Sequence, residues 1–261
     1  MTRDEIIGSI RRGEMTGTTS GLCPEYVQAN LVIVPEAYAA DVRGLCMRNP
    51  VPCPLVEELA PGAVEPRCAP GSDLRTDLPG YRLWIDGALA EKRGDVRDLW
   101  RGDLVSFLIG CSFTFEHALR DAGYPLRHQE LGVTVPMYRT NIPLLPAGRL
   151  HGLIVVSMRP FPAEMVEGVR DVTRPYAEGH GEPIHWGDPA KIGIADMAAP
   201  DEGDVVPMEP GDVPVFWGCG VTPQLVAIES KLPFVITHEP GSMFITSMRH
   251  EECALAQPVL R

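Results

Sequence analysis

The amino-acid sequence predicts an α/β fold. Short apolar runs, which suit buried strands, recur at residues 104–110, 153–158, 213–216 and 234–237, and each closes on Gly, Pro, Thr or another small residue. Segments with helical spacing of their apolar side chains lie between such runs, and residues 113–122 are the clearest example. Buried strands that alternate with helices are typical of a sheet that helices cover.

The first 90 residues contain several predicted elements. Residues 3–12 carry three isoleucines at helical spacing and predict a helix that stops before a glycine. Residues 26–35 fit a helix or a strand, and residues 37–47 fit a helix. Residues 61–79 form a long connection rich in Gly, Pro and Asp, which we expect to be irregular and unburied. Residues 81–87 predict a strand that enters an Asp-Gly turn.

The second half continues the pattern and suggests a division into subdomains. The run at 104–112 predicts a strand and a tight turn before the helix, and a short apolar run at 243–246 follows the last of the four strands. Residues 133–187 are dense in Pro and Gly. We therefore expect a main subdomain of residues 1–130 and 188–261, with a smaller subdomain inserted at 131–187. We find no internal repeat in the sequence.

Composition narrows the class of function. The 261 residues are 44% hydrophobic and carry a formal net charge of −12, which argues against nucleic-acid binding. No apolar run is long enough to span a membrane, and residues 1–5 do not begin a signal peptide. The seven cysteines form no CxxC pair, which predicts reduced thiols in a cytoplasmic protein. Nucleotide-binding and serine-hydrolase signatures, such as GxGxxG and GxSxG, are absent.

The turn after the run at 104–110 is the most informative candidate site. Gly110, Cys111 and Ser112 stand between a predicted strand and a predicted helix, where backbone N–H groups favour a thiolate or a bound carboxylate. Glu116 follows one helical turn later and could shuttle a proton. The alternative is a cysteine that packs and a glutamate that caps the helix.

Residues 138–141 form a second candidate. Tyr138, Arg139, Thr140 and Asn141 place a forked cation beside a phenol, a hydroxyl and an amide. Arginine binds carboxylates through two parallel hydrogen bonds, so the segment could hold an acidic substrate. The alternative is a polar loop between prolines. His151 comes shortly afterwards and adds an imidazole.

His185 is a third candidate, because it lies three residues before Asp188 in a predicted turn. An imidazole there could act as a general base, since its ordinary pKa is near neutrality. One His and one Asp are too few for a metal site. Additional ligands could come from His180, Asp196, Asp201 and Asp204, but no spacing requires them. We expect no cofactor, with a divalent metal as the open alternative.

Two further strand ends resemble the first. Cys219 and Thr222 follow the run at 213–216, and His238 follows the run at 234–237. Strand ends of one sheet would meet at its carboxyl edge, where open α/β folds bind ligands. Arg75 could reach the same edge, although an arginine beside an aspartate in a loop can also be a local pair.

Several segments together resemble a known family, the bacterial hydro-lyase / D-glutamate cyclase family. The resemblance runs from about Glu5 to Arg249 and is carried by residues 26–31, 73–79, 109–113, 135–141 and 213–217. It implies two α/β subdomains, a three-layer αβα main one interrupted by a smaller α+β two-layer one. It also implies a lyase of amino acid metabolism that eliminates water, for example by closing D-glutamate to 5-oxo-D-proline.

The resemblance gives the candidate residues roles. Arg139 or Arg75 would hold the substrate carboxylate, and His185 or Glu116 would deprotonate the ammonium. Backbone N–H groups after Gly110 or Gly220 would stabilise the oxyanion. The partner would be a small amino or carboxylic acid rather than nucleic acid or a membrane. We expect a homo-oligomer, such as a homodimer.

The sequence also departs from the family pattern. Ser242 and Ser247 stand where the family usually has His and Asp, and Cys23 replaces a common apolar residue. These changes leave room for another substrate in a specialised biosynthetic pathway. A Cys-dependent amidohydrolase or acyltransferase, with Cys23 or Cys111 as nucleophile, is one alternative function. A non-catalytic binding protein for a small acid is the other.

Overall fold

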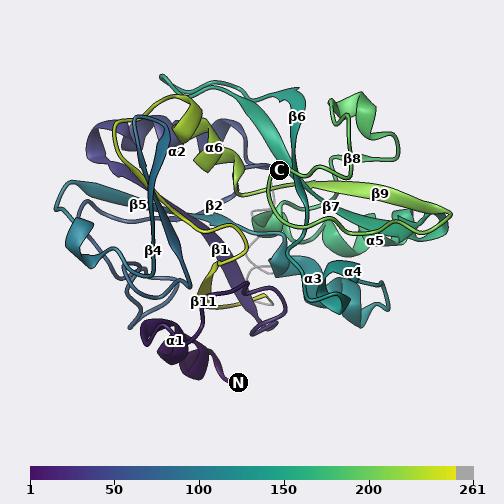
Figure 1. Ribbon diagram of the computed structural model, residues 1–261, viewed down its shortest axis with the longest axis horizontal. Helices are drawn as coiled ribbons and strands as arrows, with labels where there is room; N and C mark the ends of the chain where they lie inside the picture. The colour runs from purple at the N-terminus through teal and green to yellow at the C-terminus, as the bar shows by residue number, and fades with distance from the viewer. Residues whose placement is uncertain (251–261) are drawn as a thin grey trace, which may run out of the picture.

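The computed structural model, which describes residues 1–250, contains two antiparallel sheets with helices packed on them (Figure 1). The larger sheet holds β1 (Tyr26–Pro35), β2 (Leu55–Glu58), β3 (Tyr81–Ile85), β4 (Ala88–Arg93), β5 (Leu104–Gly110), β10 (Val235–His238) and β11 (Phe244–Arg249). The smaller sheet holds β6 (Met137–Pro143), β7 (Leu153–Pro162), β8 (His185–Trp186) and β9 (Asp212–Gly218). The helices are α1 (Arg3–Arg11), α2 (Ala39–Arg48), α3 (Phe113–Asp121), α4 (Arg127–Glu130), α5 (Val166–Thr173) and α6 (Thr222–Glu229). Short 3-10 turns are η1 (Glu36–Tyr38), η2 (Arg97–Leu99), η3 (Ala163–Met165), η4 (Ala177–Gly179) and η5 (Pro189–Ile192).

The predicted α/β class is confirmed, and so are most predicted elements. The first helix begins where predicted because Thr2 and Glu5 form a capping box, in which each side chain accepts a hydrogen bond from the other's backbone N–H. The segment at 26–35 is a strand. Strand β4 was not predicted, because its Ala-Glu-Lys-Arg sequence is polar and exposed, as suits the edge of a sheet.

The two sheets share one structural motif. In the larger sheet, β1 leads through η1 to α2 and pairs with β5, which ends in a Gly-Cys dipeptide (residues 110–111) before α3. In the smaller sheet, β7 leads through η3 to α5 and pairs with β9, which meets a Gly-Cys dipeptide (residues 218–219) before α6. The registers correspond, since the last residue of β5 opposes Ala29 and the last residue of β9 opposes Val156. The fold therefore contains an internal duplication that the sequence analysis missed.

The helix after each Gly-Cys dipeptide crosses to the other sheet. Helix α3 follows β5 of the larger sheet but packs against α5, and α6 follows β9 of the smaller sheet but packs against α2 (Figure 1). The expectation that Cys111 and Cys219 end strands of one sheet is therefore wrong. Their strands belong to different sheets, and the crossing helices join the two.

The larger sheet has an apolar core on each face. One core packs α2 and α6 against β1, β5 and β10. On the other face, the irregular connection at 61–79 contributes buried side chains, including Cys68 and Leu74. The expectation that this segment stays unburied is wrong. It can be buried because Asp77, itself fully buried, accepts hydrogen bonds from the side chains of Arg11 and Thr76 and from a backbone N–H.

The smaller sheet is also covered on both faces. Helices α3 and α5 pack on one face around Phe115 and Trp217, and η5 with its flanking residues packs on the other around Tyr138 and Phe216. Strand β9 belongs to this sheet although it lies beyond residue 187. The segment 131–187 thus does not hold the whole smaller sheet, and the proposed division into subdomains stays a prediction. None of the helices in residues 1–250 has the length and apolar character needed to cross a membrane.

Candidate active site between the two sheets

A small cavity, lined largely by buried side chains, lies where the two sheets meet. Its walls include Cys111 and Ser112 after β5, Cys219 and Val221 after β9, and His238 at the end of β10. We call this space the junction cavity. Strands β5 and β10 flank β1 and both run antiparallel to it, so their carboxyl ends lie at the same edge of the larger sheet. The turn after β9 reaches this edge from the smaller sheet.

Gly220 allows the turn after β9 to lie against the turn after β5. A Cβ atom on Gly220 would overlap the Asn30 side-chain amide and lie 2.7 Å from the carbonyl oxygen of Gly110. The same Asn30 amide donates to the Gly110 carbonyl at 2.8 Å. The two Gly-Cys turns therefore meet at Gly220, where there is no room for a side chain.

Both cysteines of the junction cavity are buried thiols. Burial raises the pKa of Cys111 well above its ordinary value and raises the pKa of Cys219 to about 11. The backbone N–H of Phe113 lies 3.5 Å from the Cys111 sulfur and lowers the pKa, but less than burial raises it. Neither sulfur is a thiolate near neutral pH, so the geometry does not favour a cysteine nucleophile.

Glu116 lies in a buried ionic network rather than in the cavity. Its carboxylate accepts hydrogen bonds from Nε of Arg159 at 3.0 Å and from Nε2 of Gln129 at 2.6 Å, and Nε2 of His128 lies 2.9 Å away. Burial alone would raise the pKa of Glu116, but His128 and Arg159 outweigh it and hold the pKa well below its usual range. A carboxylate so paired is a poor general base.

Arg159 connects that network to the cavity. Its guanidinium donates to the hydroxyl oxygen of Ser112 at 3.0 Å and to that of Ser157 at 3.2 Å. Ser112 is the N-cap residue of α3, yet its side chain makes no capping hydrogen bond, because the hydroxyl is turned toward Arg159. The N-cap of α6 is Val221, which has no side chain capable of capping. Both helices therefore begin beside the junction cavity without a side-chain cap.

His238 is fully buried, and its two ring nitrogens differ. Nδ1 accepts a hydrogen bond from the backbone N–H of Leu31 at 3.2 Å and lies 2.7 Å from Nε2 of Gln224. Nε2 has no partner within the described residues. Burial lowers the pKa of His238 to about 4. The ring is neutral at ordinary pH, and a neutral ring whose Nδ1 is an acceptor carries its proton on Nε2.

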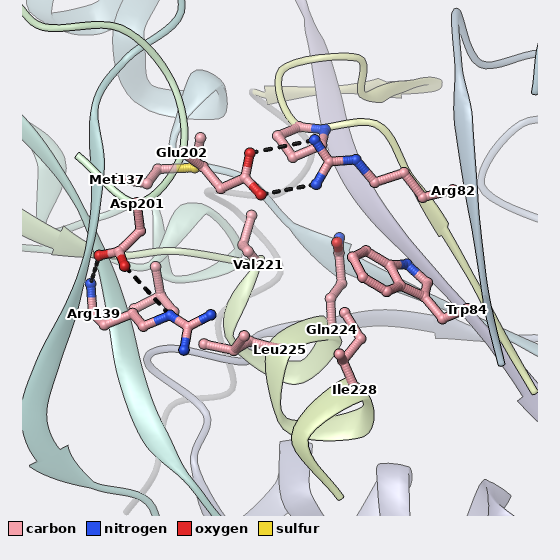
Figure 2. Close-up of a pocket in the computed structure, with 12 residues that line it drawn as sticks. Arg82, Trp84, Met137, Arg139, Asp201, Glu202, Val221, Gln224, Leu225 and Ile228 are labelled. Carbon is pink, nitrogen blue, oxygen red and sulfur yellow. Dashed lines mark hydrogen bonds and ion pairs between the residues drawn. The ribbon is translucent and has the colours of Figure 1, made fainter. Parts of the chain in front are cut away.

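A second, larger space adjoins the junction cavity and shares Met137 and Val221 with it. We call it the outer pocket (Figure 2). Trp84, Leu225 and Ile228 form apolar parts of its wall, and four charged side chains add polar parts, namely Arg82, Arg139, Asp201 and Glu202. Together the two spaces form an inner end beside His238 and a charged outer end of one candidate site.

The arginines of the outer pocket are ion-paired. Arg82, on β3, donates to Glu202 at 2.8 Å and to Glu239 at 2.7 Å (Figure 2 shows the first pair). Arg139, on β6, donates to Glu229 of α6 at 2.9 Å and lies 3.4 Å from Asp201. The Arg139 pairs are about half exposed, and pairs of that kind contribute little to stability. Arg139 can therefore exchange its partner for a bound carboxylate at small cost.

The structure brings together five of the candidate residues. Cys111, Ser112, Cys219 and His238 line the junction cavity, and Arg139 lines the outer pocket. Thr222 lies beside them at the start of α6. Its hydroxyl accepts a hydrogen bond from the backbone N–H of Val155 at 3.0 Å, which holds α6 against β7.

The remaining candidates do not line either space. Tyr138 alternates with Met137 and Arg139 along β6, so its side chain points to the opposite face and donates to the carbonyl oxygen of Met197 at 2.7 Å. Arg75 pairs with Asp73 in a separate groove near α1. Arg75 therefore does not reach the sheet edge where Cys111 lies.

The other three outlying candidates lie on the surface of the smaller sheet or near it. Nε2 of His185 lies 2.8 Å from the carbonyl oxygen of Asp188, and its ring stacks on Phe216 on the face away from α3. Asn141 packs against the turn at Gly193. His151 is exposed in the turn before β7. The geometry does not support a shared catalytic role for these side chains.

Three departures from the family pattern also have defined places. Ser242 donates to the carbonyl oxygen of Gly17 at 3.1 Å, and Ser247 donates to that of Cys68 at 3.0 Å. Cys23 packs among the isoleucines of α1, away from the junction cavity. Within residues 1–250, no three His, Cys, Asp or Glu side chains are arranged to hold a metal ion.

Sequence reasoning missed Arg82, Arg159, Glu202 and Gln224. Arg159 had a usable signal, because it interrupts the apolar strand at 153–162 and a buried charge there requires a partner. Arg82 had the weaker signal of alternating with Tyr81 and Leu83. Glu202 and Gln224 had none, because their positions depend on how distant segments fold together.

Comparison with known proteins identifies the family. The family model described as D-glutamate cyclase matches residues 105–247, which include both Gly-Cys turns and His238. The chain belongs to the D-glutamate cyclase family. A relative from Nocardioides sp. named "Putative hydro-lyase" is 53% identical over 246 residues, covering 94% of this chain and 91% of its own. One of the same name from Rhodococcus jostii is 51% identical over 257 residues and covers 98% of each chain.

The family membership supports a lyase-type function and confirms the resemblance seen in the sequence. A relative from Geobacillus kaustophilus with the same hydro-lyase name is 51% identical over 253 residues, covering 97% of this chain and 96% of its own. A solved nitrogen repressor-like protein from Methanococcus jannaschii has 10% sequence identity and a TM-score of 0.42, and the match covers 95% of this chain and 96% of that one.

Proposed function

We propose that the chain eliminates water from a small amino acid within the junction cavity and the outer pocket, without a cofactor, and that cyclisation of D-glutamate to 5-oxo-D-proline is the first reaction to test. The polarity of the site carries this proposal. The outer pocket holds both arginine and carboxylate side chains, which suit a zwitterion. Among the described residues, no carboxylate lines the junction cavity, so the inner end suits the carboxyl group that reacts.

The outer pocket supplies groups for each charge of the substrate. Arg139 would exchange its exposed partners for the α-carboxylate of the amino acid. Asp201, released from Arg139, would then lie beside the substrate ammonium together with Glu202. Either carboxylate would accept a proton from the ammonium as the amine becomes a nucleophile. Apolar contacts with Trp84 and Val221 would hold the carbon chain curled between the two ends.

The proposed reaction balances without another reactant. The amine nitrogen attacks the carbon of the side-chain carboxyl group, a C–N bond forms, and the C=O electrons move onto oxygen. One C–O bond then breaks as the C=O bond reforms. Two protons leave the ammonium and both end on the departing oxygen, which leaves as water. The lactam nitrogen keeps one hydrogen, and no electron donor or acceptor is needed.

The alternative of a cysteine nucleophile fits the geometry less well. Cys111 and Cys219 are buried and their pKa values are raised, so the thiolate is scarce near neutral pH. Cys23 lies in a separate apolar cluster. A cysteine nucleophile does not explain the charged side chains of the outer pocket, whereas an amino acid substrate does.

A substrate panel tests the proposed function. The purified protein is incubated with D- and L-glutamate, their amides and related hydroxy acids, and mass spectrometry follows loss of one water. We expect D-glutamate to lose water. In Arg139→Gln we expect KM to rise about tenfold to a hundredfold, the effect of losing a hydrogen bond to a charged group.

Arg12→Gln is the matched control, because Arg12 is also an exposed, ion-paired arginine but lies outside both spaces. We expect its KM to equal that of the wild type. Absence of turnover across the whole panel would contradict the proposal. An unchanged KM in Arg139→Gln would remove the assigned role of that residue.

A further inference from the structure

We propose that His238, as a neutral Nε2–H donor at the inner end of the site, forms the receptor for the oxygen of the reacting carboxyl group. This inference rests on the proposed function, since it assigns the inner end of the same site. It makes His238 a catalytic residue that donates a hydrogen bond without giving up its proton.

The first step is the fixed tautomer of His238. The backbone N–H of Leu31 can only donate, and it points at Nδ1 at 3.2 Å. The side-chain nitrogen of Gln224, 2.7 Å from the same atom, acts as a second donor. The carbonyl oxygen of Leu31 lies farther from Nδ1, at 3.5 Å, than the N–H does, so Nδ1 acts as the acceptor and the proton of the neutral ring sits on Nε2. That atom is buried and without a partner among the described residues, and the ring lines the junction cavity.

The second step is the place of the ring at the two turns. Ser112 after β5 and Val221 after β9 border the cavity that His238 lines. The backbone N–H groups that begin α3 and α6 already have acceptors in these turns, since those of Thr114 and Thr222 donate to the carbonyl oxygens of Cys111 and Cys219. The Nε2–H of His238 therefore offers this space an unpaired donor, and a polar atom with free lone pairs fits beside it.

The third step is the sign of the charge that the space favours. No carboxylate of residues 1–250 lines it, since Glu116 is turned into its own network with Arg159 and His128. The two thiols that line it are uncharged near neutral pH. In the tetrahedral intermediate, negative charge collects on the former carbonyl oxygen, and preorganised donors stabilise that oxygen more than they stabilise the substrate.

Nuclear magnetic resonance of the wild-type protein tests the receptor directly. Histidine labelled with ¹⁵N distinguishes a protonated from an unprotonated ring nitrogen, and a His238→Gln spectrum assigns the His238 signals. We expect Nε2 to carry the proton at neutral pH. Glutarate, which has two carboxylates but no amine to cyclise, should shift the Nε2 signal. Pentane-1,5-diol, its uncharged analogue, should leave the signal in place.

Two results would overturn the receptor. One is a proton on Nδ1 in the free protein. The other is an Nε2 signal that does not move when glutarate reaches saturation or a concentration of tens of millimolar. A kinetic comparison adds an independent measurement. His238→Phe should lower kcat about 10²- to 10³-fold, the cost of removing one oxyanion donor. His238→Gln, which keeps an N–H donor, should lose less, and equal activity of wild type and His238→Phe would refute the role.

The outcomes separate the receptor from the proposed function. If glutarate shifts the His238 signal but no amino acid loses water, the receptor stands and the proposed reaction falls. If D-glutamate is turned over while His238→Phe keeps the wild-type kcat, the reaction stands and the receptor falls.

Discussion

At the residue scale, the sequence identified the strand ends that border the junction cavity but not the side chains that surround them. Cys111, Cys219 and His238 were found because each follows a buried run and has a glycine nearby. The catalytic role expected of Glu116 stays a prediction that the geometry does not favour, because Arg159 of β7 makes the carboxylate half of a buried ion pair. Pairing between distant segments sets the charge state of a buried group, and a local pattern does not contain that information.

Removing Arg159 tests this network. Arg159→Met would leave the Glu116 carboxylate buried without its main partner, and we expect a loss of about 3–5 kcal/mol of unfolding free energy. The double variant Arg159→Met/Glu116→Leu should recover much of it, because no lone charge remains. Urea unfolding at neutral pH measures both.

The pH dependence of this network has a defined sign. The folded-state pKa of Glu116 is lowered, so its contribution to stability is complete above the unfolded-state pKa of about 4.3. The contribution is lost as pH falls from there through the folded-state pKa. Equal stabilities of wild type and Arg159→Met at neutral pH would contradict the assignment of Glu116 as a paired carboxylate.

At the scale of elements, the strand-turn-helix units were predictable, but their crossing was not. The apolar run at 104–110 correctly predicted β5, and the helical spacing of residues 113–122 correctly predicted α3. The destination of α3, which packs beside α5, depends on matching apolar faces from distant parts of the chain. Two other features were missed because their local sequence carries no signal. Strand β4 is polar and exposed, and the buried connection at 61–79 has no regular spacing of apolar residues.

The contact between the two Gly-Cys turns gives a prediction at this scale. A Cβ in Gly220→Ala would overlap the Asn30 amide and press on the Gly110 backbone. We expect this overpacking to destabilise the protein by about 1–3 kcal/mol and to lower kcat, because the starts of α3 and α6 would move apart.

Gly102→Ala is the matched control for that substitution. Gly102 has an ordinary φ, and a Cβ there would meet no atom within 4 Å. We expect its thermal unfolding midpoint to stay near that of the wild type. If Gly220→Ala unfolded at the same temperature as Gly102→Ala, the close contact described here would be incorrect.

At the scale of the whole molecule, the two sheets are related by a duplicated motif that the sequence concealed. Few identities survive between the halves, and they include the Gly-Cys dipeptides, the threonines at 114 and 222, and a proline at the end of β1 and of β7. The polar residues at matching places differ in partner, with Glu116 on α3 beside Arg159 and Gln224 on α6 beside His238. One of the two matching positions thus contributes to the ionic network and the other contacts His238, which makes the site asymmetric.

The fate of isotopically labelled oxygen tests the central claim most directly, namely that the reacting carboxyl group loses its oxygen as water in this site. D-glutamate labelled with ¹⁸O at both side-chain carboxyl oxygens is incubated with the protein in unlabelled water. We predict that the lactam keeps one labelled oxygen and that the other leaves as labelled water. A product that keeps both labels, or a substrate that loses no water at all, would contradict the claim.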